Sequence, residues 1–94
     1  MEAKTSQVTG RPYLQAEGDG YVIRTFPHNI SERRLMWHRD ETDREVEVVG
    51  ETDWKFQMDN ELPVPMKDKF FIPKETYHRI IKGTGDLTIK IWNK

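Results

Sequence analysis

Alternation of apolar and polar residues predicts short β-strands along most of this chain. In the segment 54–58 (WKFQM) every second residue is apolar, so its three apolar side chains share one face of a strand. The segment 87–92 is apolar at its odd positions, and Val46 and Val48 show the same period within 45–49. This period of two is typical of strands that bury one face against a core.

Further strands are expected where β-branched and aromatic residues gather between turn residues. Pro63 and Pro65 suit an edge strand, because proline donates no backbone hydrogen bond. The segment 83–86 (GTGD) is interpreted as the turn of a hairpin into the last strand. The expected strands cover residues 21–26, 34–38, 45–49, 54–58, 62–66, 69–72, 77–81 and 87–92.

The number and spacing of these strands predict an all-β sandwich or antiparallel barrel. The main alternative is a helix over residues 31–44, which Ser31 would cap and in which Asp40 and Arg44 would pair four residues apart. The apolar residues 35–37 are consecutive, however, and no apolar stripe continues beyond them. We therefore favour extended structure here.

Residues 1–20 form a polar segment with three glycines and one proline. It is expected to be an arm that is loosely ordered or forms an interface, followed by a barrel domain over 21–94. The 94 residues suit a single domain.

Charge and composition limit the classes of partner and metal ligand that are expected for this chain. The net charge is −1, so no basic field favours nucleic acid or a membrane surface. Cysteine is absent, which excludes disulfides and thiolate ligands, so a metal ion would need histidine and carboxylate ligands. The start of the sequence shows no cationic segment followed by an apolar run, and a cytoplasmic protein is expected.

Two of the three histidines stand in positions that suit a metal ion. His38 and Asp40 are two residues apart, so on a strand they point to the same face, together with Met36, which is expected to look inward. His78 shares its parity with Ile80 and is also expected to face the core. Two imidazoles and one carboxylate are the ligands of non-haem iron sites and also suit zinc, manganese or nickel. His28 is interpreted as a hydrogen-bonded surface residue.

The order of these residues resembles the two motifs of the cupin family. His38, Asp40, Glu45 and Gly50 are similar to the first motif, with Asp40 in place of its second histidine. The segment 67–82, with its proline and His78 at the motif spacing, is similar to the second. The resemblance implies a small cupin-type antiparallel β-barrel (jelly roll) that forms a homodimer. It also implies a divalent metal ion (iron, manganese, nickel or zinc) held by His38, Asp40 and His78, with Glu45 as a fourth ligand.

The sequence departs from the family pattern at several positions. Lys67, Glu75 and Lys82 stand where the second motif has two glycines and an asparagine. Glu45 has the motif distance from Asp40, whereas Asp43 has the motif distance from Gly50, so either acid is a candidate. Strand parity turns Glu45 outward unless a bulge intervenes.

Three kinds of function follow from the resemblance. The first is a small metal-dependent enzyme of oxygenase, isomerase or lyase type that acts on a small molecule in the barrel, with Tyr77 and Gln57 within reach of the cavity. The second is a non-catalytic module that binds or senses a small molecule or sugar. The third is a structural or assembly role in which the arm 1–20 wraps a neighbouring subunit.

Overall fold

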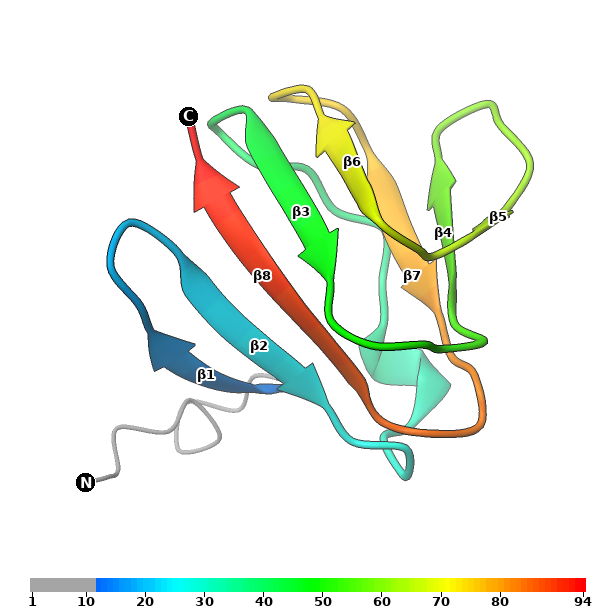
Figure 1. Cartoon of the computed structure of the whole chain (residues 1–94). Coiled ribbons are helices and arrows are strands. Elements are labelled where there is room, and N and C mark those ends of the chain that lie inside the picture. Colours follow the sequence, from blue (N-terminus) through cyan, green and yellow to red (C-terminus); the bar gives the residue numbers. More distant parts are fainter. Residues whose placement is uncertain (1–11) are drawn as a thin grey trace.

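The computed structural model describes residues 12–94 and contains, in that range, eight β-strands and one 3₁₀ helix (Figure 1). Within these residues no helix is long and apolar enough to cross a bilayer. The elements in chain order are β1 (Leu14–Glu17), β2 (Val22–Phe26), η2 (Glu32–Arg34), β3 (Arg44–Val48), β4 (Lys55–Met58), β5 (Val64–Pro65), β6 (Lys69–Ile72), β7 (His78–Ile81) and β8 (Leu87–Asn93).

The strands form two antiparallel sheets, which confirms the predicted all-β class. The larger sheet has the order β1-β2-β8-β3-β6, and the smaller has the order β5-β4-β7. In Figure 1 the smaller sheet lies beside and behind the β3–β6 end of the larger one. Apolar side chains from both sheets meet in one core, which therefore holds the two sheets together.

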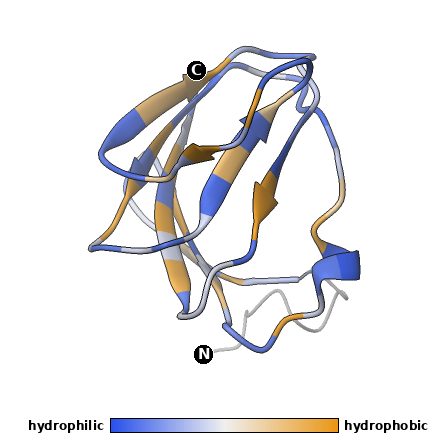
Figure 2. Cartoon of the chain, turned by 90° about the vertical axis from the view of Figure 1, so that its right-hand side faces the viewer, coloured by the Kyte–Doolittle hydropathy of each residue, from blue (hydrophilic) through white to orange (hydrophobic). Residues whose placement is uncertain are grey.

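Alternation along the strands builds this core, as predicted. Trp54 is fully buried, Phe56 follows it on the same side of β4, and the apolar residues of β8 at 87, 89 and 91 are all buried. Figure 2 shows the same alternation as stripes of opposite hydropathy along the strands. Each large apolar side chain buried in this way contributes roughly 1.5–3 kcal/mol to folding.

The structure does not contain the expected strand at 34–38 or the alternative helix over 31–44. Ser31 does cap a helical turn, since its Oγ accepts a hydrogen bond from Arg33 N at 3.3 Å, but the turn ends after η2. The chain then runs extended, and His38 forms an isolated antiparallel bridge with His78. The two backbone hydrogen bonds of this bridge, 3.0 and 2.9 Å long, replace the helical ones.

The expected hairpin at 83–86 is also absent. β7 pairs with β4, whereas β8 pairs with β2 and β3, so this turn carries the chain from one sheet to the other. The Asp53 carboxylate anchors the turn by accepting hydrogen bonds from Thr84 N and Oγ1 (2.9 and 2.8 Å), and these bonds lower the pKa of Asp53. Trp54 Nε1 adds a 2.6 Å hydrogen bond to the carbonyl of Gly85.

This anchoring predicts that substitutions at the two glycines of the turn differ in their effect on stability. A methyl group at Gly83 would lie 2.7 Å from Trp54 Cδ1 and 2.8 Å from Trp54 N, whereas one at Gly85 would meet nothing within 4 Å. Gly83→Ala is therefore expected to destabilise the fold by about 1–3 kcal/mol, because a buried ring and backbone must shift. Gly85→Ala is the control and should unfold at nearly the wild-type urea midpoint. Equal midpoints for both variants would contradict the tight packing at Gly83.

The predicted arm is ordered in part. Its residues 1–11 lie outside the described range, but β1 pairs with β2 at the edge of the larger sheet and is not a loose segment. Tyr13 packs against the core, with its ring centroid 5.2 Å from that of Phe26. The pairing explains the order, because β1 satisfies backbone groups along the outer edge of β2. Dimer formation and the role of the arm in an interface stay predictions.

Candidate metal centre

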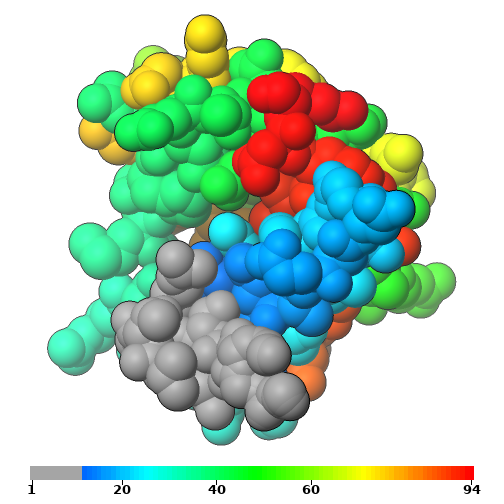
Figure 3. Space-filling model, turned by 90° about the vertical axis from the view of Figure 1, so that its left-hand side faces the viewer, coloured from blue at the N-terminus to red at the C-terminus, as the bar shows by residue number. Residues whose placement is uncertain are grey.

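A cavity of about 400 Å³ lies between the two sheets. On the face shown in Figure 3, the surface is hollowed between the segment around residues 35–45 and the strands β1 and β2. Apolar side chains from both sheets line most of the cavity, and its polar groups include His38, Asp40 and His78. The cavity thus combines an apolar interior with a small polar cluster, as ligand sites in proteins do.

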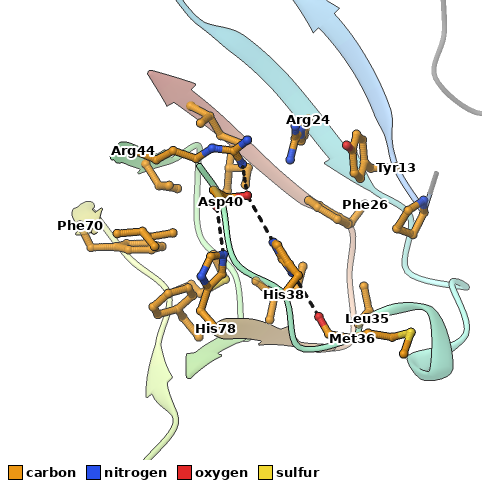
Figure 4. Close-up of a pocket in the computed structure, with 18 of the residues that line it drawn as sticks. Tyr13, Arg24, Phe26, Leu35, Met36, His38, Asp40, Arg44, Phe70 and His78 are labelled. Carbon is orange, nitrogen blue, oxygen red and sulfur yellow. Dashed lines mark hydrogen bonds and ion pairs between the residues drawn. The ribbon is translucent and has the colours of Figure 1, made fainter. Parts of the chain in front are cut away.

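The three residues predicted as ligands do come together. His78 Nε2 lies 3.4 Å from Asp40 Oδ2, and His38 Nε2 lies 4.0 Å from Asp40 Oδ1 (Figure 4). One ligand atom from each of the three residues can be chosen so that all lie within 4.8 Å of one another. Such a cluster is compact enough for its three side chains to bind a single cation.

The backbone fixes the orientation of both imidazoles. His78 Nδ1 donates a 2.8 Å hydrogen bond to the carbonyl of Thr76, and His38 Nδ1 donates a 3.2 Å hydrogen bond to the carbonyl of Met36. A carbonyl only accepts, so in the neutral ring the proton is on Nδ1 and the Nε2 lone pair points to Asp40. Metal-binding histidines are commonly oriented in this way by a partner on the other ring nitrogen.

The Asp40 carboxylate has one oxygen that pairs with Arg44 at 3.4 Å and one that the described residues leave unsatisfied. Its Oδ2 is buried and has no hydrogen-bond partner, although it faces His78 Nε2. A carboxylate oxygen that faces a lone pair is unfavourable unless a cation or a proton lies between them. The donor set of two imidazole nitrogens and one carboxylate oxygen therefore fits a divalent cation such as iron, manganese, nickel or zinc.

His78 is prepared to act as a neutral ligand. It is only 4% exposed, and this burial, together with repulsion from His38 and Arg44, lowers the pKa of His78. A neutral imidazole is the form that binds metal ions, so burial favours the competent state.

The loop of the second motif holds the first motif in place. Glu75 N donates a 2.7 Å hydrogen bond to the carbonyl of Asp40, and Lys74 N donates a 2.8 Å bond to Asp43 Oδ1. Glu75 has a φ of 61°, the left-handed conformation that favours glycine, and stands where the family motif has one. Glu75 therefore holds a backbone conformation that glycine adopts at less cost.

The candidate fourth ligands do not join the cluster. Glu45 lies on the outer row of β3, and its carboxylate is 3.4 Å from Lys94 Nζ. The register of β3 against β8 is regular from residue 44 to 48, so no bulge turns Glu45 inward. Asp43 does not line the cavity, and its Oδ1 accepts the hydrogen bond from Lys74 N. The expectation that Glu45 or Asp43 reaches the metal position is not met by this geometry.

Several other expected positions can be compared with the structure. Tyr77 and Gln57 do not line the cavity: Tyr77 is stacked under Arg39 on the surface, and the amide of Gln57 bonds Glu61 and Arg79. Met36 was expected inward but is 70% exposed at the cavity rim, because the chain there is not a regular strand.

His28 is a hydrogen-bonded surface residue, as expected. Its backbone N and ring Nδ1 lie 2.6 and 2.9 Å from the same oxygen of Asp86. These hydrogen bonds lower the pKa of the Asp86 carboxyl group.

The alternation pattern also held a signal for two of the three cavity arginines, none of which belongs to the family motifs. Arg24 and Arg44 stand in the inward rows of β2 and β3, and Arg34 reaches the cavity from η2. A charged residue in a row that is otherwise apolar is a sequence sign of a site, because such a group is costly to bury without a purpose. Arg44 also lies 3.4 Å from Asp40 Oδ1, the pairing that was predicted for a helix and that forms here without one.

Several solved structures share this architecture. An RmlC-like cupin family protein with a double-stranded β-helix fold, from Methanocaldococcus jannaschii, aligns over 86% of this chain and 78% of its own, with a TM-score of 0.65 and 8% identity. KdgF from Halomonas sp. aligns over 87% of this chain and 80% of its own, with a TM-score of 0.62 and 16% identity. Iron(II) HppE aligns over 87% of this chain, with a TM-score of 0.61 and 14% identity.

These similarities show that the chain has a cupin-like double-stranded β-helix fold, which confirms the predicted architecture. This chain spans 48% of the length of HppE. No family model matches the sequence, and no curated protein sequence matches it. At these low identities the likeness concerns the fold alone, so the chemistry must be argued from the residues of this chain.

Proposed function

We propose that this protein binds a divalent metal ion through His38, Asp40 and His78 and uses it on a small molecule held in the cavity. The observation that carries the proposal is the buried Asp40 Oδ2, which lacks a hydrogen-bond partner and faces the lone pair of His78 Nε2. A cation bound there would offset the negative charge of the carboxylate and would accept the lone pairs of both Nε2 atoms.

Different residues of the chain would have different roles around the metal ion. His38 and His78 are held by backbone carbonyls and need little reorganisation to bind. Arg44 contacts the other oxygen of Asp40 and helps to hold the carboxylate in place. The apolar residues that line most of the cavity would pack against the small molecule. The bound cation would act as a Lewis acid and polarise an oxygen of the small molecule.

Solved neighbours support this kind of function. HppE has been solved with iron(II) and also in complex with a substrate, on the same fold. A small metal-dependent enzyme of the oxygenase, isomerase or lyase type is therefore the function that we favour for this chain.

One observation favours a second candidate, a non-catalytic binding module. Among the described residues that line the cavity, Asp40 is the only carboxylate, and neither Tyr77 nor Gln57 reaches it. General acid–base chemistry would then fall to Tyr13 or to the metal-centre residues. An enzyme should lose turnover when its metal is exchanged for an inert one, whereas a binding module should keep its ligand.

Elemental analysis of wild-type protein and two carboxylate variants tests the metal centre. We expect about one equivalent of iron, manganese, nickel or zinc in the wild type and a metal content lower by about tenfold or more for Asp40→Asn, since the amide removes the negative ligand. Glu45→Gln is the matched control and should keep the wild-type metal content, because Glu45 faces outward. A wild type without metal after reconstitution, or equal losses in both variants, would contradict the proposal.

A further inference from the structure

The walls of the cavity offer a ligand few hydrogen-bonding groups. None of the described residues that line the cavity is a serine, threonine, asparagine or glutamine, and Tyr13 carries the only hydroxyl group among them. A ligand with many hydroxyl groups needs a partner for nearly every one of them, because a buried polar group without a hydrogen bond is costly. The composition of the walls therefore disfavours a sugar.

The charged groups of the walls are engaged with other residues of the protein. Arg44 lies 3.4 Å from Asp40 Oδ1. Arg24 Nε donates a 2.8 Å hydrogen bond to Gln15 Oε1, and both Arg24 and Arg34 have further partners. Among the described residues, the one buried side-chain nitrogen or oxygen without a hydrogen-bond partner is Asp40 Oδ2, at the metal position. A ligand therefore finds its strongest polar partner at the metal position and apolar contacts elsewhere.

Aromatic rings extend the apolar wall from the metal centre into the cavity. The ring centroid of Phe56 lies 5.7 Å from that of His78 and 4.7 Å from that of Phe70. Phe26 also lines the cavity, and in Figure 4 Phe26 and Phe70 lie on opposite sides of the candidate metal ligands. A hydrocarbon group beside the metal position would therefore be removed from water against these rings, which favours its binding.

We propose that the ligand of this cavity is a small molecule with a hydrocarbon body and a single alcohol or carbonyl oxygen, which lies at the metal position. This inference rests on the proposed function and deepens it by naming the class of ligand. The oxygen meets the cation, and the hydrocarbon body packs against the apolar walls, where it needs no polar partner. A cavity of about 400 Å³ accepts one molecule of this kind.

Titration of the full metal-free chain with two probes, followed by nuclear magnetic resonance, tests the ligand class. Cyclohexanol and myo-inositol share a ring of carbon atoms, but myo-inositol carries a hydroxyl group on every carbon. We expect cyclohexanol to bind about tenfold or more tightly, because the additional hydroxyl groups would lose water without gaining partners. The methyl signals of Ile80 and Ile89, which line the cavity, should shift on binding.

Two neighbouring phenylalanines provide matched variants for this titration. Phe70→Ala should weaken cyclohexanol binding about fivefold, because part of the apolar wall is lost. Phe71→Ala is the control and should bind cyclohexanol like the wild type, since Phe71 is the next residue of β6, is 50% exposed and does not line the cavity. Equal weakening in both variants would contradict binding in this cavity.

Cobalt(II)-loaded protein tests the position of the ligand oxygen. Cyclohexanol should shift the visible absorption bands of the bound cobalt(II), because its oxygen enters the coordination shell. Cyclohexane has the same ring without the oxygen and should leave these bands unchanged.

The outcomes separate this inference from the proposed function. A preference of the metal-free protein for cyclohexanol supports the ligand class even if elemental analysis finds no metal, in which case only the metal centre fails. Binding of myo-inositol at least as tight as that of cyclohexanol, or no binding of cyclohexanol, overturns the ligand class, and this comparison needs no variant to fold. Cobalt(II) bands that stay unchanged with cyclohexanol bound overturn the placement of the oxygen at the metal.

Discussion

Zinc added to the metal-free protein at about 100 times its dissociation constant is expected to raise the free energy of unfolding by about 2.7 kcal/mol. In a domain of this size the melting temperature should rise on the order of 10–20 °C. The reason is that His38, Asp40 and His78 are brought together only in the folded chain, across the bridge between His38 and His78. Differential scanning calorimetry with and without zinc measures the increase.

The double variant His38→Ala/His78→Ala should show no zinc-dependent increase relative to its own metal-free melting temperature. This internal reference matters because His78 is buried and its loss also weakens packing. His28→Ala is the matched control, since His28 bonds Asp86 on the surface and should leave the zinc response intact. A zinc response of equal size in the double variant would place the metal elsewhere. No response in the wild type would contradict the proposed metal centre.

Trp54→Ala is expected to lower the free energy of unfolding by about 3–5 kcal/mol. Trp54 is fully buried, packs against Phe26 with ring centroids 6.0 Å apart, and donates a hydrogen bond to the carbonyl of Gly85 in the turn between the sheets. A small domain has only about 5–15 kcal/mol of stability in total, so this loss should leave the variant close to unfolding. Urea denaturation followed by circular dichroism measures it.

Two further tryptophan variants identify the source of this effect. Trp54→Phe keeps a ring but loses the N–H, so it should cost less than Trp54→Ala. Trp37→Ala is the exposed control: Trp37 is 41% exposed and stacks on Arg79, so its loss should change stability by about 0.5–1 kcal/mol at most. Similar losses for Trp37→Ala and Trp54→Ala would contradict the central place of Trp54 in the core.

The sequence by itself determined the inward faces of the strands. Val46, Val48, Phe56 and Ile89 are buried as their alternation predicts, because side chains on a strand alternate with a strict period of two. These inward faces are local properties of strands, and local geometry suffices to predict them. His38 and Asp40 also lie 4.0 Å apart, but the strand on which their shared face was predicted is absent, and Met36 of the same parity is exposed.

Only the tertiary structure decided which distant segments meet. Nothing in the local pattern shows that His78 bridges His38, or that the turn at 83–86 connects two sheets, because strand pairing depends on which edges remain open in the whole fold. The motif spacing predicted Glu45 as a ligand, which required a bulge to turn its side chain inward. The regular register of β3 excludes this bulge. The cavity with Arg24 and Arg44 arises in the same way, because long-range sheet packing turns two inward rows toward one space.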